Sequence, residues 1–275
     1  HSPVEELNLA LSSSNEEKET DKPILLLIED NADVTTYIVG LLEKDYVVHT
    51  ARNGQLGIEK GYQLIPDIVI SDVMMPEKDG YEVCETLKMD ERTSHIPIIL
   101  LTAKAATSDR ITGLRKGADA YLMKPFNKEE LYVRLEKLLE LRLALQRRYA
   151  GEHFERLSKP VQSDTVAEPS LDDLFLQKLH RVVLDNLDDP NLGAEQLSQA
   201  ALLSLSQLYR KMKALTGEPP NAFIRKIRLH QAMELIKTTD RNISEIAYEV
   251  GFNDPNYFSR AFSREFGQAP SDCRK

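Results

Sequence analysis

The stretch "LLLIEDNAD", Leu25 to Asp33, places two acidic residues directly behind a run of apolar residues. An apolar run of this length predicts a strand buried on both faces, as strands are in a parallel sheet. The acidic pair, Glu29 and Asp30, then stands at the carboxyl end of that strand, where ligands bind in open α/β sheets. The stretch therefore predicts an α/β fold and the edge of its sheet where a site should lie.

Short apolar runs alternate with amphipathic helical patterns from Pro23 to Leu145, in five strand-helix units. This alternation predicts a doubly wound, five-stranded parallel sheet. The expected strands are residues 24–28, 46–51, 66–72, 96–103 and 118–125. The expected helices are residues 34–44, 54–64, 80–90, 109–117 and 127–145.

Length and composition indicate two domains, because 275 residues exceed the usual size of one. The net charge is −9, and no apolar run reaches the roughly 18 residues of a membrane span. Cys84 and Cys273 lie far apart in the sequence, so we expect reduced thiols and a cytoplasmic location. Residues 1–22 are rich in Ser and Glu, which predicts a flexible tail or linker. Because the chain begins at His1 and not at Met, we expect it to be a piece of a longer protein.

Polar side chains also stand at the ends of the later strands. Asp72, Thr102 and Lys124 each follow an apolar run and should converge with Glu29 and Asp30 on one edge. Three crowded carboxylates repel one another unless a cation lies between them, and Mg²⁺ is a hard ion that prefers oxygen ligands. Asp72 is the expected nucleophile, because a carboxylate can accept a phosphoryl group as a mixed anhydride. Lys124 and Thr102 would then contact phosphoryl oxygens.

These motifs, "IEDN", "ISDVMMPEKDGYEVC", "LTAKA" and "GADAYLMKPF", resemble the receiver domain of bacterial response regulators, from Pro23 to about Leu145. The resemblance implies that the α/β sheet is of the flavodoxin-like kind and that a histidine kinase phosphorylates Asp72. It implies a Mg²⁺ site formed by Glu29, Asp30, Asp72 and the backbone of Met74. It also implies a switch pair of Thr102 and Tyr121, and a cis peptide bond between Lys124 and Pro125.

Another class of enzyme, the haloacid dehalogenase-like phosphatases, also combines an Asp nucleophile with Mg²⁺. Its motif has a second Asp two positions after the nucleophile, whereas this chain has Met74 there. The receiver resemblance is therefore favoured over this alternative.

The apolar period is lost between Gln146 and Ser170, which predicts a linker. After it, a repeat with a period of about 50 residues pairs Arg210 with Arg260 and Gly217 with Gly267. Each copy reads as a short helix, a turn and an amphipathic helix, so the second domain is expected to be all-α with two helix-turn-helix units.

A connecting helix, "PNAFIRKIRLHQAMELIKTT", should hold the two recognition helices about one DNA turn, roughly 34 Å, apart. Between Ser204 and His230 one acid, Glu218, accompanies a set of basic residues that should attract phosphates. This set is Arg210, Lys211, Lys213, Arg225, Lys226 and Arg228. A solvated helix face is the alternative explanation of such a run.

"ISEIAYEVGFNDPNYFSRAFSREFGQAPSDCR" is similar to the AraC-type DNA-binding domain, and with the weaker first copy the resemblance covers Leu171 to Lys275. It implies helix caps at Ser204 and Asp254. The residues that would face DNA are Leu205, Ser206, Gln207, Arg210, Asn256, Tyr257 and Arg260. Two residues depart from the family pattern: Leu202 stands where the first turn usually has Gly, and Leu205 is apolar at a frequent contact position.

Together the two resemblances imply a transcription regulator controlled by phosphorylation of Asp72, and no enzymatic activity of this chain itself. The expected partners are double-stranded DNA, a histidine kinase in cis or in trans, and a second copy of the chain in a homodimer, with RNA polymerase as a further candidate. The order of the domains resembles the carboxyl part of hybrid two-component sensors, although a free regulator remains an alternative. Two rival functions are a docking module that takes no phosphate and a phosphate sink that binds DNA poorly.

Overall fold

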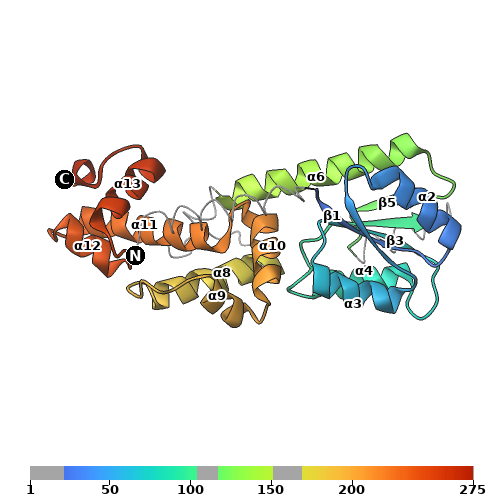
Figure 1. Cartoon of the computed structure of the whole chain (residues 1–275), viewed down its shortest axis with the longest axis horizontal. Helices are drawn as coiled ribbons and strands as arrows, with labels where there is room; N and C mark the ends of the chain where they lie inside the picture. The colour runs from blue at the N-terminus through green and yellow to red at the C-terminus, as the bar shows by residue number, and fades with distance from the viewer. Residues whose placement is uncertain (1–21, 104–116, 151–168, 275) are drawn as a thin grey trace, which may run out of the picture. The chain divides into compact units, whose positions relative to one another are not determined.

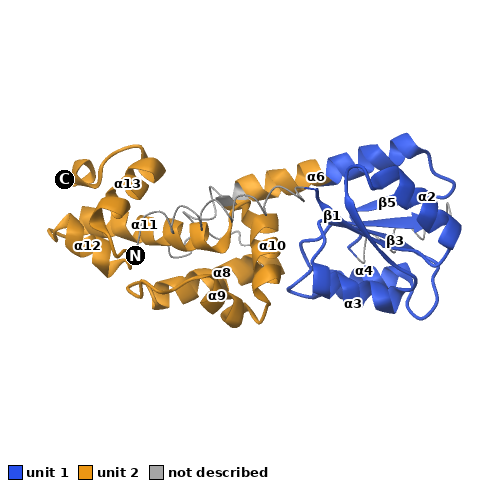
Figure 2. Ribbon diagram, in the orientation of Figure 1, with its two compact units in different colours: residues 1–138 blue, residues 139–275 orange. Residues whose placement is uncertain are grey.

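A computed structural model describes residues 22–103, 117–150 and 169–274. The chain divides into two compact units, residues 1–138 and residues 139–275 (Figure 2). Most of the expected tail at residues 1–22, and all but the last residue of the helical pattern at 109–117, lie outside the described residues. Within the described part, no helix has the length and apolar character needed to cross a membrane.

The first unit contains a five-stranded sheet in the order β2-β1-β3-β4-β5 (Figure 1). All neighbouring strands are parallel. The strands are β1 (Ile24–Ile28), β2 (Val47–Ala51), β3 (Ile68–Asp72), β4 (Ile98–Thr102) and β5 (Ala120–Met123). Each observed strand lies inside an expected one, so the predicted doubly wound fold is confirmed.

Helices cover both faces of this sheet, which explains why its central strands are continuous apolar runs. They are α2 (Ala32–Leu42), α3 (Gly54–Leu64), α4 (Gly80–Met89) and α6 (Lys128–Ala150). In Figure 1, α3 and α4 lie on one side of the sheet, and α2 and the start of α6 lie on the other. The Tyr132 hydroxyl donates a hydrogen bond to the Leu41 carbonyl at 2.5 Å and so ties α6 to α2.

Side-chain caps fix where the helices near the strand ends begin. The Asn31 side chain accepts hydrogen bonds from the backbone N–H groups of Asp33 and Val34, so α2 starts directly after the acidic pair. Asp79 and Glu82 form a capping box at the start of α4. These caps keep the polar loops at the carboxyl edge of the sheet short and well defined.

Helix α6 extends beyond the expected helix end at Leu145 and reaches Ala150. Its first part packs into the sheet unit, because Leu131, Leu135 and Leu138 are buried, as their spacing predicts. Leu141 and Leu145 are exposed. The boundary between the two compact units falls after Leu138, within α6.

All the regular elements that the structure describes in the second unit are helices. They are α8 (Leu171–Asp185), α9 (Ala194–Ala201), α10 (Leu205–Thr216), α11 (Pro220–Thr238), α12 (Ile243–Glu249), α13 (Pro255–Phe266) and the short 3-10 helix η1 (Pro270–Cys273). They surround two apolar cores. Helix α11 joins the two helical groups, because it contributes residues to both cores. Phe223, Ile224 and Ile227 belong to the first core, and Leu229, Ala232, Met233 and Ile236 belong to the second.

The predicted repeat is confirmed as two helix pairs, α9 with α10 and α12 with α13. Ser204 and Asp254 cap α10 and α13, as expected. Both second helices end at a glycine in the left-handed conformation, Gly217 at φ 75° and Gly267 at φ 72°. Corresponding sequence signals therefore produce corresponding backbone geometry in the two copies.

The turns of the two helix pairs differ in the residue that adopts the left-handed conformation. Gly251 in the second turn has φ 78°, and a Cβ atom there would lie 2.5 Å from the Leu187 carbonyl oxygen. Leu202 stands at the equivalent place in the first turn with φ 56°, and its side chain is 87% exposed. A left-handed backbone is unfavourable for Leu, so the first turn carries a local strain that the second turn avoids.

Candidate functional site

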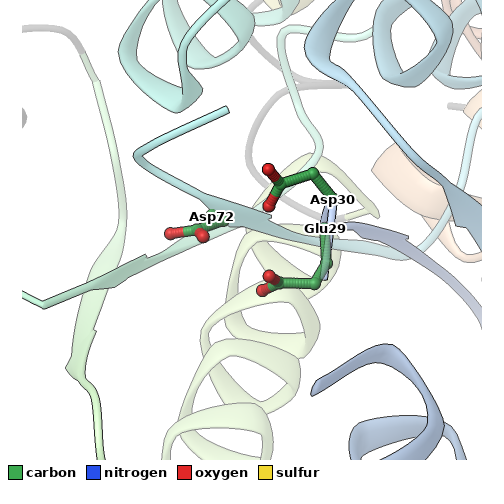
Figure 3. A group of neighbouring side chains, drawn as sticks. All are labelled: Glu29, Asp30 and Asp72. Atoms are coloured by element: carbon green, nitrogen blue, oxygen red, sulfur yellow. The ribbon is translucent and has the colours of Figure 1, made fainter. Parts of the chain in front are cut away.

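Three carboxylates meet at the carboxyl edge of the sheet, as predicted from the strand ends. Glu29 follows β1, Asp72 ends β3, and these two strands are neighbours with Ile28 opposite Ser71. A carboxylate oxygen of each of Glu29, Asp30 and Asp72 lies within 4.8 Å of the others (Figure 3). Glu29 and Asp72 are buried, whereas Asp30 is exposed, so the cluster is open to solvent on one side.

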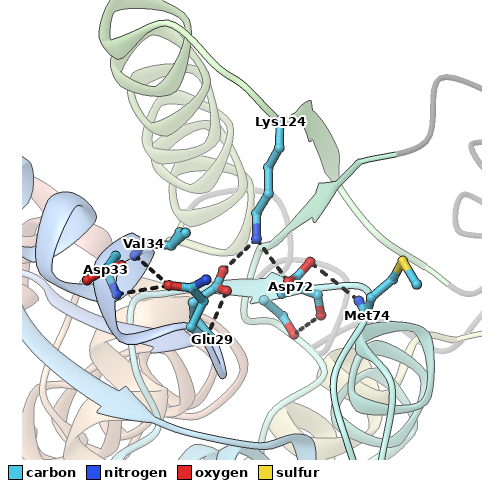
Figure 4. A network of polar contacts seen from close by, with 8 residues as sticks. Glu29, Asp33, Val34, Asp72, Met74 and Lys124 are labelled. Carbon is cyan, nitrogen blue, oxygen red and sulfur yellow. Dashed lines mark hydrogen bonds and ion pairs between the residues drawn. The ribbon is translucent and has the colours of Figure 1, made fainter.

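Lys124 reaches this cluster from the end of β5, across the width of two strands. Its Nζ atom lies 2.7 Å from Oε2 of Glu29 and 2.9 Å from Oδ2 of Asp72 (Figure 4). The Lys124–Pro125 peptide bond is cis, as expected. The predicted convergence of the lysine with the acidic residues is therefore present in the structure.

Burial and charge act on the pKa values of this group. Burial raises the pKa of Glu29, and the negative charge of Asp72 adds to this effect, while the hydrogen bond from Lys124 opposes it. Burial alone would lower the pKa of Lys124, but hydrogen bonds to Glu29 and Asp72 raise it overall. Lys124 therefore remains a fixed positive charge beside the acidic cluster.

Two further predicted residues lie along the same edge. Thr102 ends β4 and is buried, and its carbonyl accepts a hydrogen bond from the Lys124 N–H at 2.8 Å. Tyr121 in β5 is also buried, in the apolar core that contains Cys84. Burial raises the pKa of its phenol, and the hydroxyl has no hydrogen-bond partner among the described residues. The Met74 N–H points to Oδ1 of Asp72 at a long 3.4 Å.

This arrangement suits phosphoryl chemistry. Asp72 offers a carboxylate oxygen as a nucleophile, and Lys124 offers a positive charge for phosphoryl oxygens within the same small space. The three carboxylates supply hard oxygen ligands of the kind that Mg²⁺ binds. The donor set therefore fits a magnesium ion beside the nucleophile.

The predicted DNA-facing residues of the first helix pair lie at the start of α10. Leu205, Ser206 and Arg210 are at least partly exposed, with Leu205 41% exposed. Gln207 has a structural task, because its side chain accepts a hydrogen bond from the Ser204 N–H at 2.8 Å in a capping box. Ser206 and Leu205 are therefore more available to a ligand than Gln207.

The predicted residues of the second helix pair, Asn256, Tyr257 and Arg260, are all exposed along α13. The centre of the Tyr257 ring lies 6.0 Å from that of the Phe252 ring. The inner side of the same helix holds Phe258 and Phe262, which are fully buried as predicted. Helix α13 thus has one apolar side in the core and one polar side that is open to a partner.

The expected basic surface of the second unit needs a correction. Arg228 is buried, and its guanidinium donates hydrogen bonds to the Asp189 and Gly251 carbonyls. Burial lowers its pKa. Lys226 is only 14% exposed at its side chain, and its Nζ atom lies 3.9 Å from Glu218. Arg228 therefore belongs to the fold rather than to a phosphate-binding face, and Lys226 is partly covered beside Glu218.

Lys211 is a further correction, because the recognition helix turns it inward. Its side chain is fully buried, 3.0 Å from Oδ1 of Asp172 and 4.5 Å from the centre of the Phe175 ring. The spacing from Leu208 to Lys211 and Met212 places it on the apolar side of α10, a signal that the charge count overlooked. The lysine therefore fastens α10 to α8 and does not contact a ligand.

Comparison with protein families divides the chain in the same way as the structure. Residues 25–136 match the response regulator receiver domain. Residues 197–275 match a helix-turn-helix domain. Both matches agree with the two resemblances found in the sequence motifs.

Similar proteins match most of the chain or a part of it. Over 253 residues the chain is 37% identical to "Histidine kinase P4" of Formosa agariphila, an alignment that covers 92% of this chain and 18% of that protein. Over 118 residues it is 40% identical to "DNA-binding dual master transcriptional regulator RpaA" of Synechocystis sp., covering 42% of this chain and 49% of that protein. The chain thus spans less than half the length of each of these two relatives.

Among solved structures, the receiver domain of sensor histidine kinase PA1611 from Pseudomonas aeruginosa PAO1 is 31% identical, with a TM-score of 0.41. The match covers 43% of this chain and 98% of that chain. That structure has a magnesium ion coordinated in the active site cleft.

Proposed function

Because the chain combines a response regulator receiver domain with an AraC-type helix-turn-helix domain, we propose that it is a transcription regulator controlled by phosphorylation of Asp72. The observation that carries this proposal is the position of Lys124, 2.9 Å from Asp72 and 2.7 Å from Glu29, in the same chain as a doubled helix-turn-helix. One unit accepts the signal and the other binds DNA.

Glu29, Asp30, Asp72 and the backbone carbonyl of Met74 would hold Mg²⁺. The carboxylate oxygens that lie within 4.8 Å of one another support this assignment. When bound, the ion neutralises negative charge on an incoming phosphoryl group. The exposed side of the cluster at Asp30 leaves room for a phosphodonor to approach.

In the proposed transfer, an Asp72 carboxylate oxygen attacks the phosphorus of a phosphohistidine. The new O–P bond forms as the N–P bond breaks, and the imidazole leaves with the electron pair of that bond. Lys124 pairs with a phosphoryl oxygen, and the Thr102 hydroxyl donates a hydrogen bond to another. Tyr121, buried beside Thr102's strand, is the second member of the proposed switch pair.

The DNA-binding residues of the proposal are those on the open sides of α10 and α13. In α10 they are Leu205, Ser206, Gln207 and Arg210, and in α13 Asn256, Tyr257 and Arg260. Leu205 would contact a thymine methyl group, because its apolar side chain offers no hydrogen bond to a base edge. Gln207 would have to give up its cap to read a base.

The similarity to a histidine kinase of greater length supports a hybrid protein in which the kinase is in cis. In that setting we expect a receiver domain at residues 23–145, a linker at 146–170, a DNA-binding domain at 171–275, and action in the cytoplasm. We further expect a homodimer formed through the receiver surface that includes Lys128 to Lys137. The other part of this expected surface is residues 110–117, and all of these except Gly117 lie outside the described residues. RNA polymerase is a further candidate partner of the DNA-bound form.

Labelling by radioactive acetyl phosphate tests the proposed phosphoacceptor. The wild-type chain should be labelled in the presence of Mg²⁺. Asp72→Asn should abolish labelling because an amide is no nucleophile. A chelator should abolish it because it removes the Mg²⁺ that neutralises charge on the phosphoryl group. Asp33→Asn is the matched control, since Asp33 is an exposed acid near the same edge. Labelling that persists in Asp72→Asn would contradict the proposal.

A further inference from the structure

A hollow of about 340 Å³ lies between the connecting helix α11 and the second recognition helix α13. Helix α11 contributes Arg225 and, one turn later, Leu229. Helix α13 contributes Tyr257, Arg260 and Arg264, whose spacing of three and four residues places them on one side of the helix. The hollow therefore includes Tyr257 and Arg260, which were predicted to face DNA, and extends along α13 to Arg264.

The charges around this hollow are unbalanced. Three guanidinium groups line it, and Glu265 is the one acid in the lining. The Glu265 carboxylate also lies 3.9 Å from Nε2 of His230. Within the described ranges, Arg225, Arg260 and Arg264 form no ion pair. Like charges one turn apart on a helix are unfavourable, so this arrangement fits an anionic ligand better than a purely structural role.

We propose that this hollow binds one phosphate of the DNA backbone, held jointly by Arg225 and Arg264. The planar fork of a guanidinium matches phosphate oxygens, and the Tyr257 hydroxyl is a further donor to the same group. This inference rests on the proposed DNA-binding function. It adds that Arg225 and Arg264 contact the backbone, whereas other residues of α13 contact the bases. The phosphate would tie α11 to α13 and fix the angle at which the recognition helix enters the groove.

The position of each arginine along α13 supports this division. Residues near the start of a recognition helix contact base edges, so Asn256 and Arg260 are placed for reading. Arg264 lies one turn further on, near the helix end at Phe266. It therefore approaches the sugar-phosphate backbone rather than the floor of the groove. Arg225 reaches the same hollow from a helix that does not enter the groove.

Two variants test the contact on an operator obtained by selection from random duplexes. Arg225→Gln and Arg264→Gln should each weaken binding roughly tenfold on operator and unrelated DNA alike, and should reduce the salt slope by about one unit. Arg181→Gln is the matched control, because Arg181 is an arginine on α8 whose side chain is 83% exposed. All three replaced side chains are exposed, so thermal melting should show intact folds.

Neutral methylphosphonates placed one at a time along the operator then identify the phosphate. One position should weaken wild-type binding, and the same position should have no further effect on either Arg225→Gln or Arg264→Gln. Sensitivity of the two variants to different phosphates would overturn the joint contact, as would variants that bind like wild type. Inhibition by inorganic phosphate that depends on Arg264, with unchanged DNA affinity, would assign the hollow to a free anion and also overturn it.

A separate result distinguishes this inference from the function on which it rests. If the wild-type chain, phosphorylated or not, selects no DNA at all, the proposed function fails and the phosphate contact fails with it. If the wild type selects an operator that Arg260→Ala weakens while Arg225→Gln and Arg264→Gln do not, only the phosphate contact fails.

Discussion

The ammonium nitrogen of Lys124 lies 2.9 Å from a carboxylate oxygen of Asp72, although 52 positions separate these residues in the chain. The contact joins the end of β5 to the end of β3 with the whole of β4 between them. It balances part of the negative charge that Glu29, Asp30 and Asp72 bring to one place. Its removal should therefore have consequences both for stability and for signalling.

Lys124→Gln is expected to lower the free energy of unfolding of the first unit by about 1–3 kcal/mol without Mg²⁺, because two buried carboxylates lose their charged partner. Addition of Mg²⁺ should recover part of this loss, since the ion supplies positive charge to the same group. Urea unfolding with and without Mg²⁺ measures both effects. Lys44→Gln, at an exposed lysine of the same unit, should change neither value. Equal stability of Lys124→Gln and wild type would contradict the role of the ion pair.

The raised pKa of Glu29 predicts how Mg²⁺ binding depends on pH. The folded chain holds the Glu29 proton more tightly than the unfolded chain, so this group favours folding at low pH and ceases to do so as pH rises through its raised pKa. Mg²⁺ requires the ionised carboxylate and must displace that proton. The stabilisation by Mg²⁺ should therefore decline on acidification, beginning above the ordinary Glu value of 4.5.

Thermal melting at fixed Mg²⁺ concentration across a series of pH values measures this decline. Glu29→Gln should bind Mg²⁺ more weakly and should lose the part of the pH dependence that begins above 4.5. A Mg²⁺-induced shift in Tm that stays constant from neutral pH to about pH 5 would contradict the prediction.

Lys211→Ala should destabilise the second unit by about 3 kcal/mol, the lower end of the cost of breaking a buried ion pair, because Asp172 retains some exposure. Lys213→Ala on the same helix is the control, since Lys213 is exposed and should change stability little. Chemical unfolding of the whole chain, followed by a signal that reports on the second unit alone, measures the difference. Similar stabilities of the two variants would show that the contact between Lys211 and Asp172 contributes little.

Leu202→Gly should raise the free energy of unfolding by about 1 kcal/mol, because glycine adopts the left-handed conformation without strain and the exposed Leu side chain loses few contacts. Leu205→Gly, three residues later, should instead cost about 0.5 kcal/mol, because glycine at the first position of helix α10 loses more backbone entropy on folding than leucine. Thermal melting compares the two. A stability loss in Leu202→Gly would mean that the side chain makes contacts that outweigh its backbone strain.

Much of the fold follows from local sequence patterns. The run from Leu25 to Ile28 predicts a buried parallel strand, and alternation with helices predicts the doubly wound sheet that the structure has. The carboxyl ends of parallel strands share one edge, so Glu29, Asp72 and Lys124 could be brought together by topology alone. The caps at Ser204 and Asp254 were also predictable, because their residue types suit that position.

The roles of individual charges were less predictable, because they depend on which side of a helix faces the core. Lys211 and Arg228 count as positive charge in the sequence, yet each lies inside with partners from distant elements, Asp172 and Gly251. Arg264 received no role from the sequence motifs, although its spacing from Arg260 places both on one side of α13. Tertiary packing decides between such alternatives, and a count of charges contains no information about it.

We propose that phosphorylation at Asp72 controls DNA binding in the second unit. The most direct test measures the affinity of the whole chain for its selected operator by fluorescence anisotropy, with and without beryllofluoride, a phosphoryl mimic, in the presence of Mg²⁺. We predict that beryllofluoride changes the affinity of the wild type, and that Asp72→Asn does not respond. Equal operator affinity of the wild type with and without the mimic, in a chain whose Asp72 is labelled by acetyl phosphate, would contradict the claim and indicate a phosphate sink.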